Sequence, residues 1–485
     1  MDTRAPTAPE LLADLAAAVG AEQLSTGDDD RLRHGTDESW HDPAPPDAVV
    51  YPGSTEDVVA VVRACAAHRT PLIPFGAGSS LEGHVAALHG GVCIDMTRMN
   101  RILRVSVEDM DATVEAGVTR LQLEAKLRPE GVFYPVDPGA DATIGGMIAT
   151  GASGTTTVRY GGTRENVLAL RAVTADGRVI TTGTRARKSS AGYDLTHLLI
   201  GSEGTLGVVT EATLRLRPTP EAMSAAVCAF PTLDAAVDCV IAVSQYGIAV
   251  ARIELLDEAS MDAVERRFEL GYAIAPTLFL EFHGSDAEVR EQAAAVGELA
   301  EEHGSAGFTW TTDESERRRL WDARHRAYEA GLALRAGARI FTADACVPIS
   351  RLAETIKLTR RDIDEAGILA PILGHVGDGN FHVMFVLEPG DEEGLEVVKR
   401  LNDRLVERAI AAEGTCTGEH GVGYGKSGYL VAERGREAVD AMRAVKAALD
   451  PEGLLNPGKV LPDPRRAGVR PRRGRAPRRR RWPNS

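Results

Sequence analysis

The sequence predicts an α+β protein with two main domains, and three features of the chain indicate this class. Up to Pro218, short strands are separated by glycine-rich segments, and residues 167–183 (VLALRAVTADGRVITTG) have the alternation of two strands around an Asp-Gly turn. Beyond Pro220, long helical patterns alternate with single strands, as in helices packed on an antiparallel sheet. The two prolines mark the boundary between the domains.

The first domain is expected to begin with a helix over residues 9–19. Ser54 is a typical N-cap for a second helix that continues to His68, because its hydroxyl can accept a free backbone N–H of the first turn. The other elements expected here are strands over 71–75, 91–95 and 112–117, a helix over 121–128, and a strand-rich closing segment over 205–220. Residues 135–162 are rich in small residues and have no clear period.

The second domain is expected to contain longer helices and single strands in turn. Helices are predicted over residues 233–245, 287–303, 314–335, 350–366, 392–412 and 434–449. Strands are predicted over 250–257, 277–284 and 340–348, and as a pair around a tight Gly-Asp-Gly-Asn turn over 372–389.

The charge of the chain is unevenly distributed. The formal net charge is −15, yet the segment from Arg465 to Arg481 holds many arginines and no acidic residue. Such a tail cannot bury enough apolar area to fold, so residues 463–485 are predicted to be disordered. Because the acidic body would repel phosphates, we expect no nucleic-acid partner.

The cysteines and the hydropathy pattern predict a cytoplasmic protein. Six scattered cysteines without a Cys-x-x-Cys pair favour reduced thiols in an intracellular compartment. No apolar stretch is long enough for a transmembrane span. A peripheral contact at the inner face of the membrane is left open.

Two glycine-rich segments of the first domain have the composition of an anion-binding loop. The first, PFGAGSSLEG from Pro74 to Gly83, follows an expected strand, and its small residues let consecutive backbone N–H groups approach one anion. The second runs from Asp137 to Gly154. Neither has the dinucleotide fingerprint or the P-loop ending. Composition alone leaves two interpretations open, a pyrophosphate cradle and ordinary turns.

The order of six motifs narrows this choice. PFGAGSSLEGH, DPGADATIGGMIATGASGTTTVRYGG, KSSAGYDLTHLLIGSEGTLGVVTEATLRLRP, GHVGDGNFH, GEHGVGYGK and LLNPGK follow one another along the chain. Together, from about Asp47 to Val460, they closely resemble the FAD-linked D-lactate dehydrogenase and glycolate oxidase D-subunit family. The resemblance implies a flavoprotein of the vanillyl-alcohol oxidase and p-cresol methylhydroxylase type, with a two-subdomain FAD-binding domain and an α+β substrate domain whose sheet is antiparallel.

The resemblance also implies a division of the chain into four segments. These are an FAD-binding domain over 1–219 with its core at 47–218, a substrate domain over 220–425 that carries the metal site, a helical segment over 426–462 that returns to the FAD-binding domain, and the tail over 463–485.

The residues expected to contact FAD follow from the same resemblance. The pyrophosphate would lie against Pro74, Gly76, Ala77, Gly78, Ser79 and Ser80. The ribityl chain and flavin would lie against Asp137, Pro138, Asp141, Thr143, Gly145, Gly146, Ala149, Ala152, Ser153 and Gly154. The adenosine end would contact Glu203, Gly204, Gly207 and Val208; Asn456 would return to the flavin edge, and Tyr160 is a further cofactor contact.

We expect FAD to be bound without a covalent link. Some relatives attach FAD through a histidine, and His84, just past the first glycine-rich segment, is the candidate for such a link. The other interpretation of His84 is an ordinary loop histidine.

A possible metal site is indicated by two histidines and a glutamate. The tight turn between their strands should bring His375 and His382 together, and Glu419 follows in a loop after a long helix. This ligand set suits a borderline divalent ion such as Zn²⁺ or Mn²⁺, although paired histidines are often only hydrogen-bonded polar groups. The resemblance implies the metal, because metal-dependent relatives bind it through the matching residues.

The implied reaction is the oxidation of a small D-2-hydroxy acid to the 2-keto acid. A bound cation would lower the pKa of the substrate hydroxyl, and His420, beside Glu419, is placed to take its proton as general base. Hydride would pass to flavin N5. Arg324 matches the family's carboxylate-binding arginine, whereas Arg326 points to nearly the opposite side of the helix. Tyr328 and Asn380 are expected, with His420, to contact the substrate as well.

One departure from the family pattern narrows the choice of substrate. D-2-hydroxyglutarate dehydrogenases of this group carry a lysine two residues before the aspartate that Asp344 matches, and Thr342 stands there. A distal carboxylate would lack a cation, which favours D-lactate or glycolate.

Several other functions remain open at this point. They are a D-2-hydroxyglutarate dehydrogenase, an alkylglycerone-phosphate-synthase-like flavoenzyme, a non-catalytic flavoprotein subunit, and a metal-dependent hydrolase, although the hydrolase would leave both glycine-rich segments unexplained. The electron acceptor is expected to be a cytochrome, a quinone, an electron-transfer flavoprotein or O₂, and no motif chooses among them.

Overall fold

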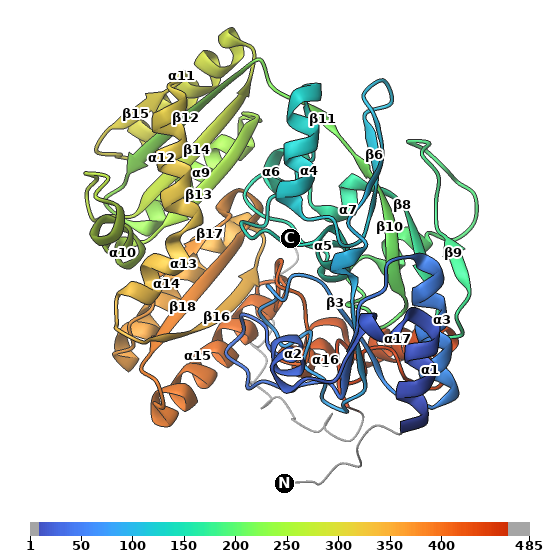
Figure 1. Cartoon of the computed structure of the whole chain (residues 1–485). Helices are drawn as coiled ribbons and strands as arrows, with labels where there is room; N and C mark the ends of the chain where they lie inside the picture. The colour runs from blue at the N-terminus through green and yellow to red at the C-terminus, as the bar shows by residue number, and fades with distance from the viewer. Residues whose placement is uncertain (1–8, 464–485) are drawn as a thin grey trace, which may run out of the picture.

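The computed structural model describes residues 9–463, which form four sheets with helices packed around them (Figure 1). Apart from Asp463, the predicted Arg-rich tail lies outside the described residues. The α+β class predicted from the sequence is confirmed. Within the described part of the chain, no helix combines the length and the apolar character needed to cross a membrane.

The N-terminal half begins with a four-stranded sheet in the order β1-β2-β4-β3, in which β2, β4 and β3 run parallel. Ser54 caps one of its helices as predicted, accepting the backbone N–H of Asp57 at 3.1 Å. The strands are β1 (Leu24–Ser25), β2 (Ala48–Val50), β3 (Leu72–Phe75) and β4 (Val92–Asp95), and the helices are α1 (Pro9–Val19), α2 (Asp28–His34) and α3 (Thr55–Ala67). The first glycine-rich segment starts where β3 ends.

A five-stranded antiparallel sheet completes the N-terminal half, in the order β5-β6-β10-β8-β9. It contains the predicted hairpin of β8 and β9, which pair antiparallel. Its strands are β5 (Ile102–Ser106), β6 (Asp111–Glu115), β8 (Val167–Val173), β9 (Val179–Thr181) and β10 (Val208–Arg215), and a separate pair is formed by β7 (Val132–Phe133) and β11 (Arg217–Pro218). Its helices are α4 (Arg120–Leu127), α5 (Ile144–Thr150), α6 (Thr157–Tyr160), α7 (Thr163–Asn166) and α8 (Leu195–Leu199).

The C-terminal half is built on a seven-stranded sheet in the order β15-β12-β14-β13-β17-β18-β16, and all its pairs are antiparallel, as predicted. The strands are β12 (Ala222–Ala229), β13 (Val250–Leu256), β14 (Thr277–Gly284), β15 (Phe308–Thr311), β16 (Arg339–Cys346), β17 (Ile372–Gly374) and β18 (Asn380–Leu387).

Helices cover both faces of this sheet, because successive side chains of a strand point to opposite faces. Leu278 and Leu280 of β14 pack in one core cluster and Phe279, between them, packs in another. The first face carries α9 (Leu233–Gln245), α11 (Asp286–Glu302), α14 (Ile349–Ala366) and α15 (Glu392–Ala411), and the second carries α10 (Glu258–Phe268), α12 (Glu314–His325) and α13 (Ala327–Ala333).

The end of the described chain returns to the N-terminal half. After α16 (Leu430–Arg434) and α17 (Arg436–Leu449), the chain pairs with β3, where the backbone N–H of Leu72 donates to the carbonyl of Leu454 at 2.9 Å. Lys446 of α17 also donates to the carbonyl of Thr205 at 2.7 Å.

The structure corrects one predicted helix. The prediction of a single helix over residues 314–335 was wrong, because α12 ends at His325 and α13 begins at Ala327. Helix α12 contacts β12, whereas α13 contacts β16 and β18 towards the other edge of the sheet, so one straight helix could not follow both. The sequence also gave no expectation of β12, β15 or α10.

Candidate active site

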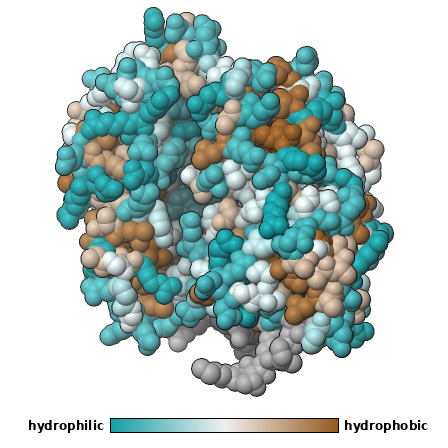
Figure 2. Space-filling view, viewed as in Figure 1, coloured by the Kyte–Doolittle hydropathy of each residue, from teal (hydrophilic) through white to brown (hydrophobic). Residues whose placement is uncertain are grey.

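A cavity of about 780 Å³ is enclosed by the glycine-rich segments of the N-terminal half and by the seven-stranded sheet with its helices. This volume lies in the usual range for cofactor and substrate pockets. The face of the molecule drawn in Figure 2 is hollowed between the two halves, and hydrophilic residues border the hollow.

Most of the residues predicted to contact the cofactor line this one cavity. They are Pro74, Gly76, Ala77, Gly78, Ser79, Ser80, Pro138, Asp141, Thr143, Gly146, Ala149, Ala152, Ser153, Glu203, Gly204 and Asn456. Segments more than a hundred residues apart along the chain therefore meet around the same space.

The other predicted cofactor residues do not line the cavity: Asp137, Gly145, Gly154, Tyr160, Gly207 and Val208. Asp137 is ion-paired with Arg252 at 3.2 Å, and Tyr160 hydrogen-bonds the ring of His283 at 2.7 Å. A Cβ on Gly154 would lie 1.9 Å from the carbonyl oxygen of Asp137, so this glycine permits a close backbone crossing. Asp137, Gly154 and Tyr160 therefore make their contacts within the protein.

The loop after β3 fits an anionic group such as a diphosphate. The backbone N–H groups of Ala77, Gly78 and Ser79 donate no hydrogen bond to any other described residue. Free, consecutive backbone donors in a glycine-rich turn are a typical anion cradle. A Cβ on Gly76 would lie 2.2 Å from Oγ1 of Thr143, so the two glycine-rich segments can approach each other only because Gly76 has no side chain.

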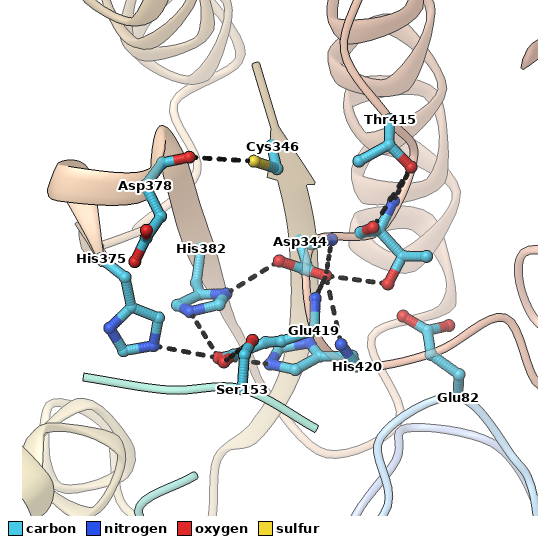
Figure 3. A network of polar contacts seen from close by, with 12 residues as sticks. Glu82, Ser153, Asp344, Cys346, His375, Asp378, His382, Thr415, Glu419 and His420 are labelled. Atoms are coloured by element: carbon cyan, nitrogen blue, oxygen red, sulfur yellow. Dashed lines mark hydrogen bonds and ion pairs between the residues drawn. The ribbon is translucent and has the colours of Figure 1, made fainter. Parts of the chain in front are cut away.

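His375, His382 and Glu419 converge as the turn between β17 and β18 predicted. Nε2 of His375 and Nε2 of His382 each lie 3.1 Å from the same oxygen, Oε1 of Glu419. Figure 3 shows both rings directed at this carboxylate. The three ligand atoms lie within 4.8 Å of one another, which fits a divalent ion bound by two imidazoles and a carboxylate.

Two buried carboxylates stand behind these histidines, one for each ring. Oε1 of Glu254 lies 2.7 Å from Nδ1 of His375, and Oδ1 of Asp344 lies 3.3 Å from Nδ1 of His382. Such partners fix the orientation of a metal-binding imidazole. Glu254 was not predicted as a site residue, although an acidic residue inside the apolar strand VARIELL was a signal for it.

The two histidines and the two carboxylates behind them come from neighbouring strands or their ends. Glu254 lies on β13, His375 directly follows β17, His382 lies on β18 and Asp344 lies on β16. These four strands are consecutive in the sheet. Asp344 and His382 are direct cross-strand partners. A second set of possible ligands, Asp344, His382 and His420, shares His382 with the first.

Charge and burial oppose each other in this cluster. Burial alone would lower the pKa of His375, but the carboxylates of Glu254 and Glu419 outweigh it and raise that pKa well above its usual value. Burial would raise the pKa of Glu419, but the two histidines hold it well below its usual range. A divalent cation at this position would take the place of the protons on the histidines.

His420 lines the cavity beside the cluster. Its ring stacks on that of His382, with centroids 4.8 Å apart, and its Nε2 lies 3.7 Å from Oε1 of Glu419. Burial lowers the pKa of His420 to about 4, and the nearby Asp344 carboxylate only partly offsets this. Burial thus favours the uncharged imidazole, the form that can accept a proton.

Arg324 and Tyr328, predicted to contact substrate, both line the cavity, as does Thr342. Arg324 is buried, and its Nη2 lies 2.5 Å from Oε2 of Glu254. Arg326 does not line the cavity and pairs instead with Glu329 at 2.8 Å.

Asn380 is also outside the cavity lining. It is buried at the start of β18, where a Cβ on Gly418 would meet its side chain at 2.5 Å. It therefore packs against the residue that precedes Glu419.

Glu203 has a contact that the sequence did not suggest. Its carboxylate accepts the backbone N–H groups of Val422 at 2.6 Å and Gly423 at 2.8 Å. It also lies 3.4 Å from Nε2 of His84, a histidine that lines the cavity. Glu203 thus joins the N-terminal half to the segment just beyond Glu419 and His420.

Comparisons with known families cover nearly the whole chain. Residues 46–183 match the family model described as an FAD binding domain, and residues 219–460 match that described as FAD linked oxidases, C-terminal domain.

Individual relatives match over similar lengths. A protein named probable D-lactate dehydrogenase, mitochondrial, from Danio rerio is 49% identical over 93% of this chain and 91% of its own length. D-lactate dehydrogenase [cytochrome], mitochondrial, from Arabidopsis thaliana is 44% identical, covering 93% of this chain and 80% of that protein. Glycolate oxidase subunit GlcD from Bacillus subtilis (strain 168) is 34% identical, covering 92% and 96%.

Solved structures share the fold at low identity. p-Cresol methylhydroxylase with substrate bound has a TM-score of 0.76 at 17% identity, covering 93% of this chain and 96% of that one. An alkyldihydroxyacetonephosphate synthase has a TM-score of 0.75 at 21% identity, covering 93% and 86%. These likenesses confirm the p-cresol methylhydroxylase-type fold. Together with the family models and the relatives, they establish that the chain belongs to the FAD-linked D-lactate dehydrogenase and glycolate oxidase D-subunit family.

Proposed function

We propose that the chain oxidises a small D-2-hydroxy acid, D-lactate or glycolate, to the 2-keto acid. FAD bound without a covalent link would be the oxidant, and a divalent ion, Zn²⁺ or Mn²⁺, would be held by His375, His382 and Glu419. The observation that supports this function is that the glycine-rich segments, this cluster and Arg324 all line one cavity. D-lactate and glycolate are also the substrates in the names of the relatives. The division of the chain at residues 219 and 425 is part of the same proposal.

When bound, FAD accepts the hydride of the substrate, and the divalent ion lowers the pKa of the substrate hydroxyl. The residues of the chain bind and orient the substrate and move its proton. Arg324 would hold the carboxylate, because a guanidinium offers a planar pair of donors and Glu254 fixes its position. The uncharged His420 would take the hydroxyl proton. Tyr328 would form part of the wall that encloses the substrate.

Non-covalent binding of FAD is supported by the surroundings of His84. Nε2 of this buried histidine faces Glu203 at 3.4 Å, and a Cβ on Gly421 would lie 2.7 Å from the same atom. The nitrogen is therefore directed at the segment that follows His420.

A metal-dependent hydrolase is less well supported than a flavoenzyme. It would use the histidine cluster but leave the three free backbone donors of residues 77–79 without a ligand. Likeness to alkyldihydroxyacetonephosphate synthase, at 21% identity, concerns the fold alone.

Reoxidation of the flavin would require a separate acceptor in the cytoplasm or at the inner face of the membrane. A cytochrome, a quinone and an electron-transfer flavoprotein are the proposed partners, and the name of the Arabidopsis thaliana relative includes a cytochrome. Mixing each acceptor with anaerobically reduced protein and following the return of flavin absorbance would choose among them.

The proposed function is tested by anaerobic reduction of the flavin across a panel of D- and L-2-hydroxy acids. We expect bleaching by D-lactate or glycolate, a much slower response to L-lactate, and little response to D-2-hydroxyglutarate. A protein that is not yellow, or one that no 2-hydroxy acid bleaches, would rule the proposal out.

A further inference from the structure

The carboxylate of Asp344 is bound differently at its two oxygens. Oδ2 accepts hydrogen bonds from the segment that carries Glu419 and His420. The donors are Oγ1 of Thr417 at 2.9 Å and the backbone N–H groups of Gly418 at 2.7 Å, Glu419 at 3.2 Å and His420 at 3.4 Å. Oδ1 faces the ring of His382 on the neighbouring strand (Figure 3). The group is completely buried.

Oδ1 of Asp344 and Nδ1 of His382 face each other. They lie 3.3 Å apart, an ion-pair distance rather than a well-aligned hydrogen bond, and neither has a hydrogen-bond partner elsewhere in residues 9–463. An ionised carboxylate can only accept, so Nδ1 of His382 carries a proton at this contact. Nε2 lies 3.1 Å from Oε1 of Glu419, which is also an acceptor, so a cation bound there would replace a proton on Nε2 while the Nδ1 proton stays with Asp344.

We propose that Asp344 is a positioning residue for the metal site: it holds the segment with Glu419 and His420 in place and selects the His382 tautomer that can bind a cation through Nε2. This inference rests on the metal site of the proposed function and assigns it a residue that does not itself bind the ion. It treats His375, His382 and Glu419 as the ligands, rather than the alternative set of Asp344, His382 and His420.

Lys426 allows this carboxylate to stay charged while buried. Its Nζ donates to the backbone carbonyl of Asp344 at 3.0 Å and lies 3.8 Å from Oδ2. Lys426 also pairs with Glu82, at the end of the first glycine-rich segment, at 3.1 Å.

The substitution Asp344→Asn tests the tautomer directly. The four donors at Oδ2 require an acceptor, so the amide oxygen should take that place and the amide NH₂ should face Nδ1 of His382. His382 must then accept at Nδ1 and carry its proton on Nε2, where it blocks the metal. We expect the affinity for Mn²⁺ to fall about 10–100-fold, as for other lost partners of metal-binding histidines, while FAD content stays normal.

Glu433→Gln is a matched control. The side chain of Glu433 is also buried. Its carboxylate binds the chain just before Thr417, accepting from Oγ1 of Thr415 at 3.0 Å and from the backbone N–H of Cys416 at 2.9 Å. It makes no hydrogen bond or ion pair with His375, His382 or Glu419 among the described residues. We expect this variant to bind Mn²⁺ with roughly the wild-type affinity.

The measurement uses FAD-loaded protein stripped of metal, titrated with Mn²⁺ against a competing chelator. Unchanged affinity in Asp344→Asn, or an equal loss in Glu433→Gln, would overturn the positioning role. If the wild-type protein binds no metal, the metal site itself fails, which is a different result.

A second measurement does not depend on whether the variant folds. In Zn²⁺-loaded wild-type protein with ¹⁵N-labelled histidine, His382 should carry its proton on Nδ1 and bind zinc through Nε2. Zinc on Nδ1 of His382 would overturn the inference, because it is the arrangement expected if Asp344 were itself a ligand.

Discussion

Arg324 and His375 are bound to the two oxygens of one buried carboxylate, that of Glu254. Nη2 of Arg324 lies 2.5 Å from Oε2, and Nδ1 of His375 lies 2.7 Å from Oε1. Because Glu254 is completely buried, neither partner can move without leaving a charge uncompensated. The residue proposed to hold the substrate carboxylate is thereby fixed relative to one proposed metal ligand.

Arg324→Ala should weaken the binding of D-lactate by about 2–4 kcal/mol, because a charge-assisted contact is lost and a carboxylate is left unpaired. Rapid-mixing measurements of flavin bleaching against substrate concentration give the affinity and the limiting rate separately. Arg324→Lys is a useful second variant, since it keeps the charge beside Glu254 but cannot form a paired contact.

Arg326→Ala is the control for this experiment, because Arg326 pairs with Glu329 and does not line the cavity. It should bind D-lactate normally. Normal binding in Arg324→Ala would place the substrate carboxylate elsewhere, and His325, which lines the cavity, would be the next residue to test.

His420→Ala should slow flavin reduction by about 10²–10⁴-fold, the usual effect of removing a general base, with little change in apparent affinity for substrate. The same rapid-mixing experiment measures it. Reduction at the wild-type rate would show that the base is another residue. His84 and His325 are the remaining cavity-lining histidines outside the proposed ligand set.

Removal of the metal should abolish turnover while FAD stays bound, because the free backbone donors of residues 77–79 are not among the proposed metal ligands. Added Zn²⁺ or Mn²⁺ should restore activity to the chelated protein, and His382→Ala should remain inactive after the same addition. Full activity in a preparation that elemental analysis shows to be free of metal would contradict this.

Thr342→Lys should shift the preference towards an acid with a second carboxylate. Thr342 lines the cavity and is the cross-strand partner of Met384, which lines it too. A lysine in place of Thr342 would add the cation that a distal carboxylate needs. A new charge-assisted hydrogen bond of about 1.5–3 kcal/mol corresponds to roughly a 10–100-fold rise in the ratio of kcat/KM for D-2-hydroxyglutarate to that for D-lactate.

Thr342→Met is the matched control, because it adds length without charge. It should lower activity on both acids without raising this ratio. An increase of the same size in Thr342→Met would attribute the preference to cavity shape rather than to charge.

FAD should be released when the protein is precipitated with acid, since Nε2 of His84 is directed at Glu203 and the segment beyond His420. The absorbance of the supernatant measures the released flavin. Colour that remains with the pellet would demonstrate a covalent link, and its loss in His84→Ala would identify the attachment residue.

The sequence by itself determined the elements whose pattern is local. The helix over 233–245 and the strand over 277–284 have the predicted bounds, because apolar periodicity records which side of an element is buried. The tight turn between His375 and His382 likewise predicted that their rings would meet, and their centroids are 5.2 Å apart. The motifs also identified the family.

Tertiary structure decided which side chains stand behind the proposed ligands and which face the cavity. Glu254 and Asp344 reach their histidines only because β13, β17, β18 and β16 are neighbours in the sheet, an order that no local pattern records. Gly145 and Tyr160 belong to the same motif as Ser153, yet only Ser153 lines the cavity. The break at Arg326 likewise depends on which strands α12 and α13 contact. Periodicity encodes burial along one element, whereas the distance between two side chains depends on how separate elements pack.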